Sequence, residues 1–79
     1  MGRQSEIGAR LRQARLQSTP KITQKDLSAR LETMEVYLDP TMLSKIENGK
    51  RKVSTEEATK IAQALKVDVR WLLGLIDRL

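Results

Sequence analysis

The chain has 79 residues, which is enough for one domain with a small core. It contains no cysteine and no histidine, so disulfide bonds, thiolate or imidazole metal sites and histidine-based catalysis are excluded. Fifteen basic and ten acidic residues give a net charge of +5, which favours an anionic partner.

Two helices are predicted in the first half of the chain. After a tail without any pattern (residues 1–4), apolar residues recur with helical spacing over Ser5–Gln17. A turn that contains Pro20 follows. The second helix is expected to begin at Thr23, which forms a capping-box-like pair with Asp26. Its apolar stripe consists of Leu27, Leu31 and Met34.

A short third helix is predicted between Asp39 and Gly49. Asp39 is a good N-cap, Pro40 fits the first helical position, and Gly49 provides a left-handed stop. At 100° per residue, one face carries Leu43, Ile46 and Glu47, and the other carries Thr41, Ser44, Lys45 and Asn48. The mostly apolar face is expected to pack on the body of the domain, with the polar face outside.

Two further helices complete the chain. The fourth is predicted over Thr55–Leu65, where Ser54 and Glu57 form a Ser-x-x-Glu capping box. The fifth is expected to start after Asp68. It carries two apolar stripes on opposite sides, one of Val69, Leu72, Leu73 and Ile76 and one of Trp71, Leu75 and Leu79. Two stripes are more than one small core needs.

Several motifs occur in the order and spacing of a known family. They are Thr23-Gln24, Leu27, the run Leu-Ser-Lys-Ile-Glu-Asn-Gly-Lys at 43–50, Ile61–Leu65 and Trp71–Gly74. Over residues 7–74 they resemble the Cro/CI-type (XRE-like) helix-turn-helix domain of lambdoid phage repressors and many bacterial regulators. The resemblance implies an all-α, five-helix, lambda-repressor-like fold in which helices two and three form the helix-turn-helix. The domain is expected over residues 5–76, with 77–79 as a C-terminal end available for a dimer contact.

One segment departs from the family pattern. Many members join helices two and three by a short turn with a glycine, whereas residues 32–38 form a longer link without one. We expect helix two to run an extra turn and Val36 or Leu38 to enter the core.

The resemblance assigns the polar face of the third helix to DNA. The residues expected to read bases are Gln24, Pro40, Thr41, Met42, Ser44 and Lys45. Glutamine can form two hydrogen bonds to adenine N6 and N7, and lysine can donate to guanine O6 and N7. The methyl groups of threonine and methionine can contact the methyl group of thymine. The residues expected at phosphates are Thr23, Asn48, Lys50, Arg51 and Lys52, which set the register without reading sequence. The alternatives are a solvated polar helix face and a charge run that only favours the helix dipole.

Two further sets of residues have expected structural roles. The resemblance implies an ion pair between Arg15 and Glu47, because an inward carboxylate needs a partner; the alternative leaves both exposed. The stripe of Trp71, Leu75 and Leu79 is expected at a dimer interface. Its alternative is that the fifth helix ends at Gly74 and the last residues fold back over the core.

The expected function is sequence-specific transcriptional regulation, by a repressor that binds a palindromic operator as a homodimer. One alternative is an antitoxin or co-regulator module that binds a partner protein such as a toxin, and another is a purely structural helical domain. No glycine-rich phosphate loop or pair of carboxylates on a concave face suggests an enzyme, and neither cofactor nor metal is expected. No apolar run approaches the ~20 residues that span a bilayer, and no signal peptide opens the chain. A bacterial or phage-encoded protein of the cytoplasm, without membrane contact, is therefore expected.

Overall fold

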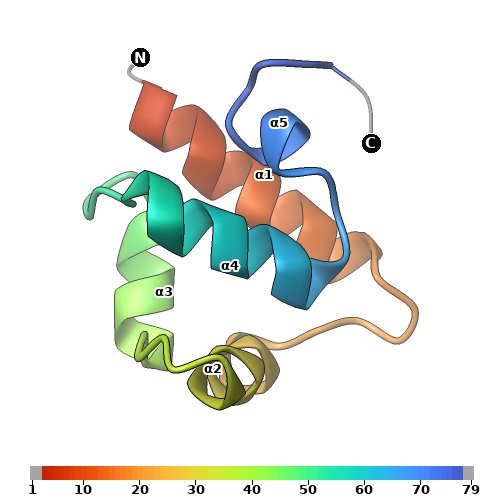
Figure 1. Ribbon diagram of the computed structural model, residues 1–79, viewed down its shortest axis with the longest axis vertical. Helices are drawn as coiled ribbons and strands as arrows, with labels where there is room; N and C mark the ends of the chain where they lie inside the picture. The colour runs from red at the N-terminus through yellow and green to blue at the C-terminus, as the bar shows by residue number, and fades with distance from the viewer. Residues whose placement is uncertain (1–2, 78–79) are drawn as a thin grey trace.

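The computed structural model describes residues 3–77 and shows an all-helical domain in that range (Figure 1). Its helices are α1 (Arg3–Gln17), α2 (Gln24–Thr33), α3 (Pro40–Glu47), α4 (Thr55–Leu65) and α5 (Val69–Leu72). The helices α1 and α4 cross at the centre, with α3 along one side and α2 at one end. This arrangement confirms the predicted five-helix, lambda-repressor-like fold. No helix of the described residues is long and apolar enough to cross a membrane.

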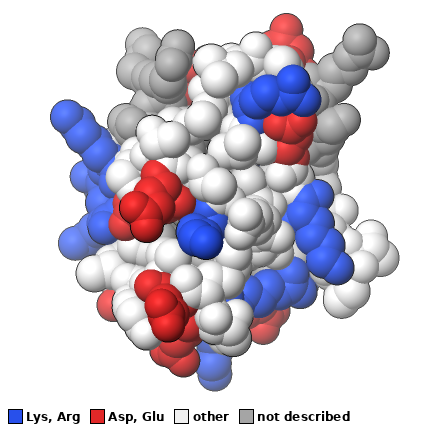
Figure 2. Space-filling view, in the orientation of Figure 1, with Lys and Arg blue, Asp and Glu red and all other residues white. Residues whose placement is uncertain are grey.

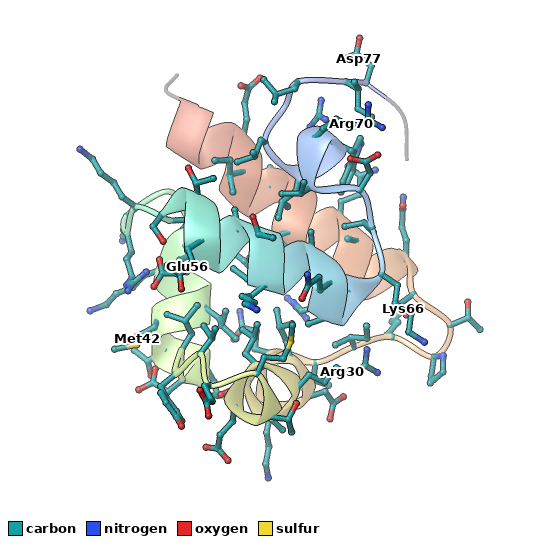
Figure 3. All side chains as sticks on the ribbon, viewed as in Figure 1. Arg30, Met42, Glu56, Lys66, Arg70 and Asp77 are labelled. Carbon is teal, nitrogen blue, oxygen red and sulfur yellow. The ribbon has the colours of Figure 1, made fainter. Side chains whose placement is uncertain are left out.

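One core joins all five helices. The side chains at its centre, each less than 2% exposed, are Ile7, Leu11, Leu27, Leu31, Leu43, Ile46, Ile61 and Leu72. They are the residues that the helical periodicity places on inward stripes. A guanidinium also contributes to helix packing, because Arg30 of α2 (labelled in Figure 3) donates to the carbonyl of Ala64 (3.0 Å) near the end of α4. Such a donor satisfies a carbonyl that has no partner within its own helix.

The predicted helix starts at Thr23, Asp39, Ser54 and Asp68 are all confirmed as N-caps. Thr23 and Ser54 each form a complete capping box with the acidic residue three positions on. The carboxylate of Asp39 accepts the backbone N–H of Met42 at 2.8 Å. Local sequence therefore determines where these four helices begin.

Two boundaries differ from the prediction. The helix α1 begins at Arg3, so part of the expected tail is helical. The helix α2 ends at Thr33, and the expected extra turn does not form, because the N–H groups of Met34 and Val36 both bond back to the Leu31 carbonyl (2.9 Å each). The link then continues without regular structure to Asp39, with Leu38 only 2% exposed and Val36 partly buried, as expected for a link anchored in the core.

The turn after α2 contains a non-glycine residue in the left-handed region, Glu35, with φ of 62°. A side chain with a Cβ is strained there, and glycine is not. We therefore expect Glu35→Gly to raise the free energy of unfolding by up to about 1 kcal/mol, measured by urea denaturation. Glu32→Gly is the matched control and should lower it, because Glu32 lies within α2. A lower stability for Glu35→Gly than for the wild type would contradict the account.

The C-terminal segment corrects the prediction of a two-striped fifth helix. The helix α5 has only four residues, and Gly74 follows with φ of 81°. Trp71 is 3% exposed and belongs to the core, so it lies on no surface stripe with Leu75. The guanidinium of Arg10 lies over the Trp71 ring (5.3 Å to its centre) and donates to the carbonyls of Trp71 (2.6 Å) and Ile76 (2.8 Å). The segment after α5 thus folds back against α1, while the third predicted member of the stripe, Leu79, lies outside the described residues.

The start of α5 has a titratable cap. Hydrogen bonds from the Arg70 side chain, and then from the Arg70 backbone, lower the pKa of Asp68 from its ordinary 3.8 to about 2. A lowered pKa contributes stability above the unfolded value, and this contribution is lost as the pH falls from about 4 towards 2. We therefore expect Asp68→Asn, which keeps a good N-cap, to be less stable than the wild type at pH 7. The difference should shrink as the pH approaches 2 in thermal melts, and a difference independent of pH would contradict this.

Candidate nucleic-acid interface

The helix α3 has one face fixed on the body of the domain. Leu43 and Ile46 are fully buried, and the side chain of Glu47 beside them is only 2% exposed. A carboxylate at that depth requires a charged or hydrogen-bonding partner.

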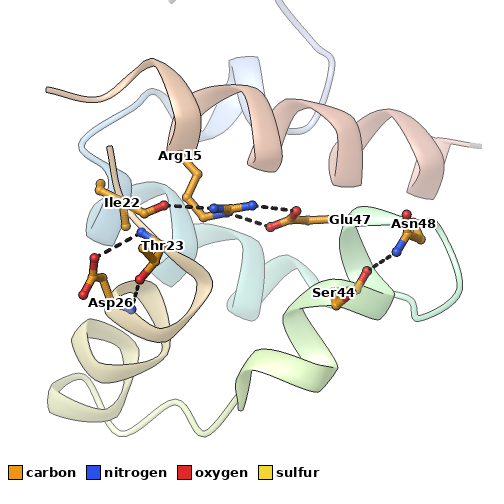
Figure 4. Close-up of polar contacts among 7 residues, drawn as sticks. All are labelled: Arg15, Ile22, Thr23, Asp26, Ser44, Glu47 and Asn48. Carbon is orange, nitrogen blue, oxygen red and sulfur yellow. Dashed lines mark hydrogen bonds and ion pairs between the residues drawn. The ribbon is translucent and has the colours of Figure 1, made fainter. Parts of the chain in front are cut away.

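Arg15 of α1 is that partner, as Figure 4 shows. Its Nε and Nη2 donate to the two carboxylate oxygens of Glu47 at 2.8 and 2.9 Å, in the bidentate geometry that suits a guanidinium. Its Nη1 donates to the carbonyl of Ile22 at 3.0 Å, just before α2 begins. One side chain thus ties together α1, the start of α2 and the end of α3.

A glycine allows α1 and α3 to approach closely. A Cβ placed on Gly8 would lie 2.1 Å from the carbonyl oxygen of Ile46 and 2.9 Å from that of Glu47. Both distances are shorter than a Cβ can tolerate, and both obstacles are backbone atoms. The sequence analysis missed this residue, although a glycine in the interior of a predicted helix is a signal of close packing.

The opposite face of α3 is open to solvent. Pro40, Thr41, Lys45 and Asn48 are exposed, and Ser44 between them is half-buried. Met42 is 38% exposed and points outward from α3 (Figure 3). Apart from Asn48, which is a predicted phosphate contact, these are the predicted base-reading residues of the third helix, and they lie on one side of the domain. Gln24 is the first residue of α2 and is half-buried.

The predicted phosphate contacts are less uniform. Lys50 and Lys52 are exposed in the loop after α3, and Figure 2 shows cationic side chains at this edge of the molecule. Arg51 instead pairs with Glu57 of α4 (3.3 Å). Burial raises the pKa of Glu57, but hydrogen bonds from Arg51 and the Ser54 backbone outweigh it and lower that pKa overall. Part of the Arg51 charge is therefore already compensated.

Two other members of the phosphate set are also engaged. The hydroxyl of Thr23 accepts the N–H of Asp26 at 3.0 Å, and the side-chain amide of Asn48 donates to the Ser44 carbonyl at 2.9 Å (Figure 4). Both side chains are exposed, and Asn48 keeps one amide hydrogen and its oxygen beyond this bond. No group of three or more acidic side chains in the described residues is arranged to hold a metal ion.

The helices α2 and α3 follow each other in the chain, and α3 has a polar outward face with cations after it. This arrangement defines a helix-turn-helix protein of the DNA-binding class. Residues 11–72 match the model of the helix-turn-helix family, so the chain belongs to this family, in its Cro/CI-like (XRE-like) form. The protein is thus a DNA-binding helix-turn-helix regulator, and its family is not an enzyme family. No curated protein and no solved structure matches the chain.

Proposed function

We propose that the protein is a transcriptional repressor that binds a palindromic operator as a homodimer, with α3 in the major groove. It would act in the cytoplasm of a bacterium, encoded by that cell or by a phage, and block polymerase by occupying the promoter. The observation that carries the proposal is that α3 has two different faces. Its inner face is buried and held by the Arg15–Glu47 ion pair, and its polar outer face is exposed to solvent. A helix held in this way presents its side chains to base edges without moving.

Side-chain chemistry indicates which residues contact bases and which contact phosphates. Lys45, near the centre of the outer face, suits guanine O6 and N7, and Thr41 and Met42 offer methyl contacts to thymine. Gln24 reaches the duplex from the start of α2. Lys50 and Lys52 supply phosphate contacts, each of which should add about 0.9 to the slope of log affinity against log salt. Arg51 should contribute less, because it is paired with Glu57.

The dimer contact that we propose does not include Trp71, because this side chain is buried in the core. Among the residues of this region that the structure describes, Leu75 is the large apolar side chain that is exposed, at 58%. We place the two-fold contact around Leu75, which would set two α3 helices about 34 Å apart, one turn of DNA. The same exposed side chain supports a second candidate function, an antitoxin or co-regulator module that binds a partner protein there.

Selection from a pool of random duplexes at physiological salt tests both candidates. Enrichment of a two-fold symmetric motif with half-sites one turn apart supports the dimeric regulator. A motif without symmetry would remove the dimer from the proposal. The absence of any enriched sequence would contradict the repressor and favour the module that binds a protein.

A further inference from the structure

An open groove of about 270 Å³ lies between α2 and the start of α3. Its lining residues are Ser28, Glu32, Tyr37, Leu38, Asp39 and Met42. Two of these lining residues, Tyr37 and Leu38, belong to the link between α2 and α3.

The side chain that stands over this groove is Tyr37. It is 70% exposed, the most exposed large apolar side chain in the described part of the chain. The backbone that carries it is nevertheless fixed, because Leu38 after it is buried and the N–H of Val36 before it donates to the Leu31 carbonyl (2.9 Å). The exposed Tyr37 ring contributes little to the hydrophobic core. Because its backbone is anchored, the ring is available as a contact surface for a partner.

The groove is continuous with the face of α3 that is proposed to read DNA. Met42 lines the groove and also projects from the outward side of α3. A duplex that lies against the first turn of α3 must therefore also lie against the mouth of the groove. DNA is thus the occupant that the position of the groove favours.

The charges around the groove decide which part of the duplex it can receive. Glu32 is an exposed acid at its edge, and the Asp39 carboxylate lies at the start of α3. Two carboxylates repel a phosphate, whereas the exposed apolar surfaces of Tyr37 and Met42 suit a methyl group. In the major groove, the methyl group presented by the bases is the 5-methyl of thymine.

We infer that Tyr37 is a further specificity-determining residue, which together with Met42 receives the 5-methyl group of a thymine at the end of each half-site beside the N-terminus of α3. The inference rests on the proposed DNA-binding function and adds to it a residue outside the helix-turn-helix helices. The contact is apolar, so the Tyr37 hydroxyl takes no part in it.

The test uses the selected operator and copies of it in which single thymidines are replaced by deoxyuridine, which lacks the methyl group. For the wild type, replacement at one position of each half-site should weaken binding several-fold. Tyr37→Ala should bind the unmodified operator about tenfold more weakly, as expected for the loss of one base contact, and should no longer respond to that replacement. Tyr37→Phe should behave as the wild type. Leu16→Ala, which shortens an exposed apolar side chain on α1, is the matched control and should bind normally.

The other outcomes overturn the inference in recognisable ways. A loss of binding for Tyr37→Phe equal to that for Tyr37→Ala would indicate a hydrogen bond from the Tyr37 hydroxyl, for example to a phosphate, instead of an apolar contact. Unchanged binding of Tyr37→Ala, with binding still weakened by Lys45→Ala, would reject the Tyr37 contact and leave the proposed function intact; the groove would then be open to a protein partner. Failure of the wild type to select any motif would reject both.

Discussion

Replacement of Glu47 by alanine is expected to destabilise the fold by about 3–5 kcal/mol. The variant leaves the guanidinium of Arg15, whose side chain is only 9% exposed, without its carboxylate partner. Domains of this kind have only about 5–15 kcal/mol of total stability, so this loss is a large fraction of the total and should lower the unfolding midpoint clearly. Urea denaturation followed by the fluorescence of the single, buried tryptophan measures the effect.

A double variant separates charge from packing in this prediction. Arg15→Met combined with Glu47→Leu removes both charges and keeps the approximate volume, so it should be far more stable than Glu47→Ala alone. A midpoint of Glu47→Ala within error of the wild type would show that the ion pair does not hold α3 in place.

Gly8→Ala is the second change with a large expected effect. In an ordinary helix the substitution stabilises by roughly 0.5–1 kcal/mol, because glycine pays more conformational entropy. Here the new Cβ would meet the Ile46 carbonyl at 2.1 Å, so α1 and α3 must separate. We expect a loss of about 1–3 kcal/mol, typical of an overpacked site. DNA affinity should fall in addition, because the shifted helix is the one that we propose to read the operator.

The neighbouring residue provides the control for Gly8. Ala9→Gly lies on the exposed side of the same helix and should lose stability through helix propensity alone, without a change in operator affinity at temperatures where it is folded. A Gly8→Ala variant that is more stable than the wild type would contradict the close approach of α1 and α3.

Much of this structure could be predicted because its determinants are local. Capping at Thr23, Asp39, Ser54 and Asp68 depends on side chains within three residues of the helix start, so the sequence displays it directly. The two faces of α3 follow from helical periodicity in the same way. The family resemblance then supplied the Arg15–Glu47 pair, which spans 32 residues and which periodicity alone does not reveal.

Two of the three features that were misplaced or missed depend on contacts between distant segments, and the third depends on a turn whose residue types give no signal. Trp71 looked like part of a second stripe because the prediction continued α5 past Leu72, whereas Arg10 binds the Trp71 and Ile76 carbonyls and folds the chain back. The helix α2 ends at Thr33, where the chain turns through hydrogen bonds to the Leu31 carbonyl and a left-handed Glu35. Glutamate is not a residue type that predicts the end of a helix. The role of Gly8 depends on the position of α3, which no local pattern specifies.

The central claim is that the outward face of α3 reads DNA sequence, and the most direct test compares the motifs selected by the wild type and by Lys45→Ala from one pool of random duplexes. The side chain of Lys45 is exposed, so the variant should fold normally. The account predicts that Lys45→Ala selects the same motif with the preference relaxed at one base pair in each half-site. An identical motif at uniformly lower affinity would show that Lys45 only neutralises phosphate, and would contradict the assignment of this face to base reading.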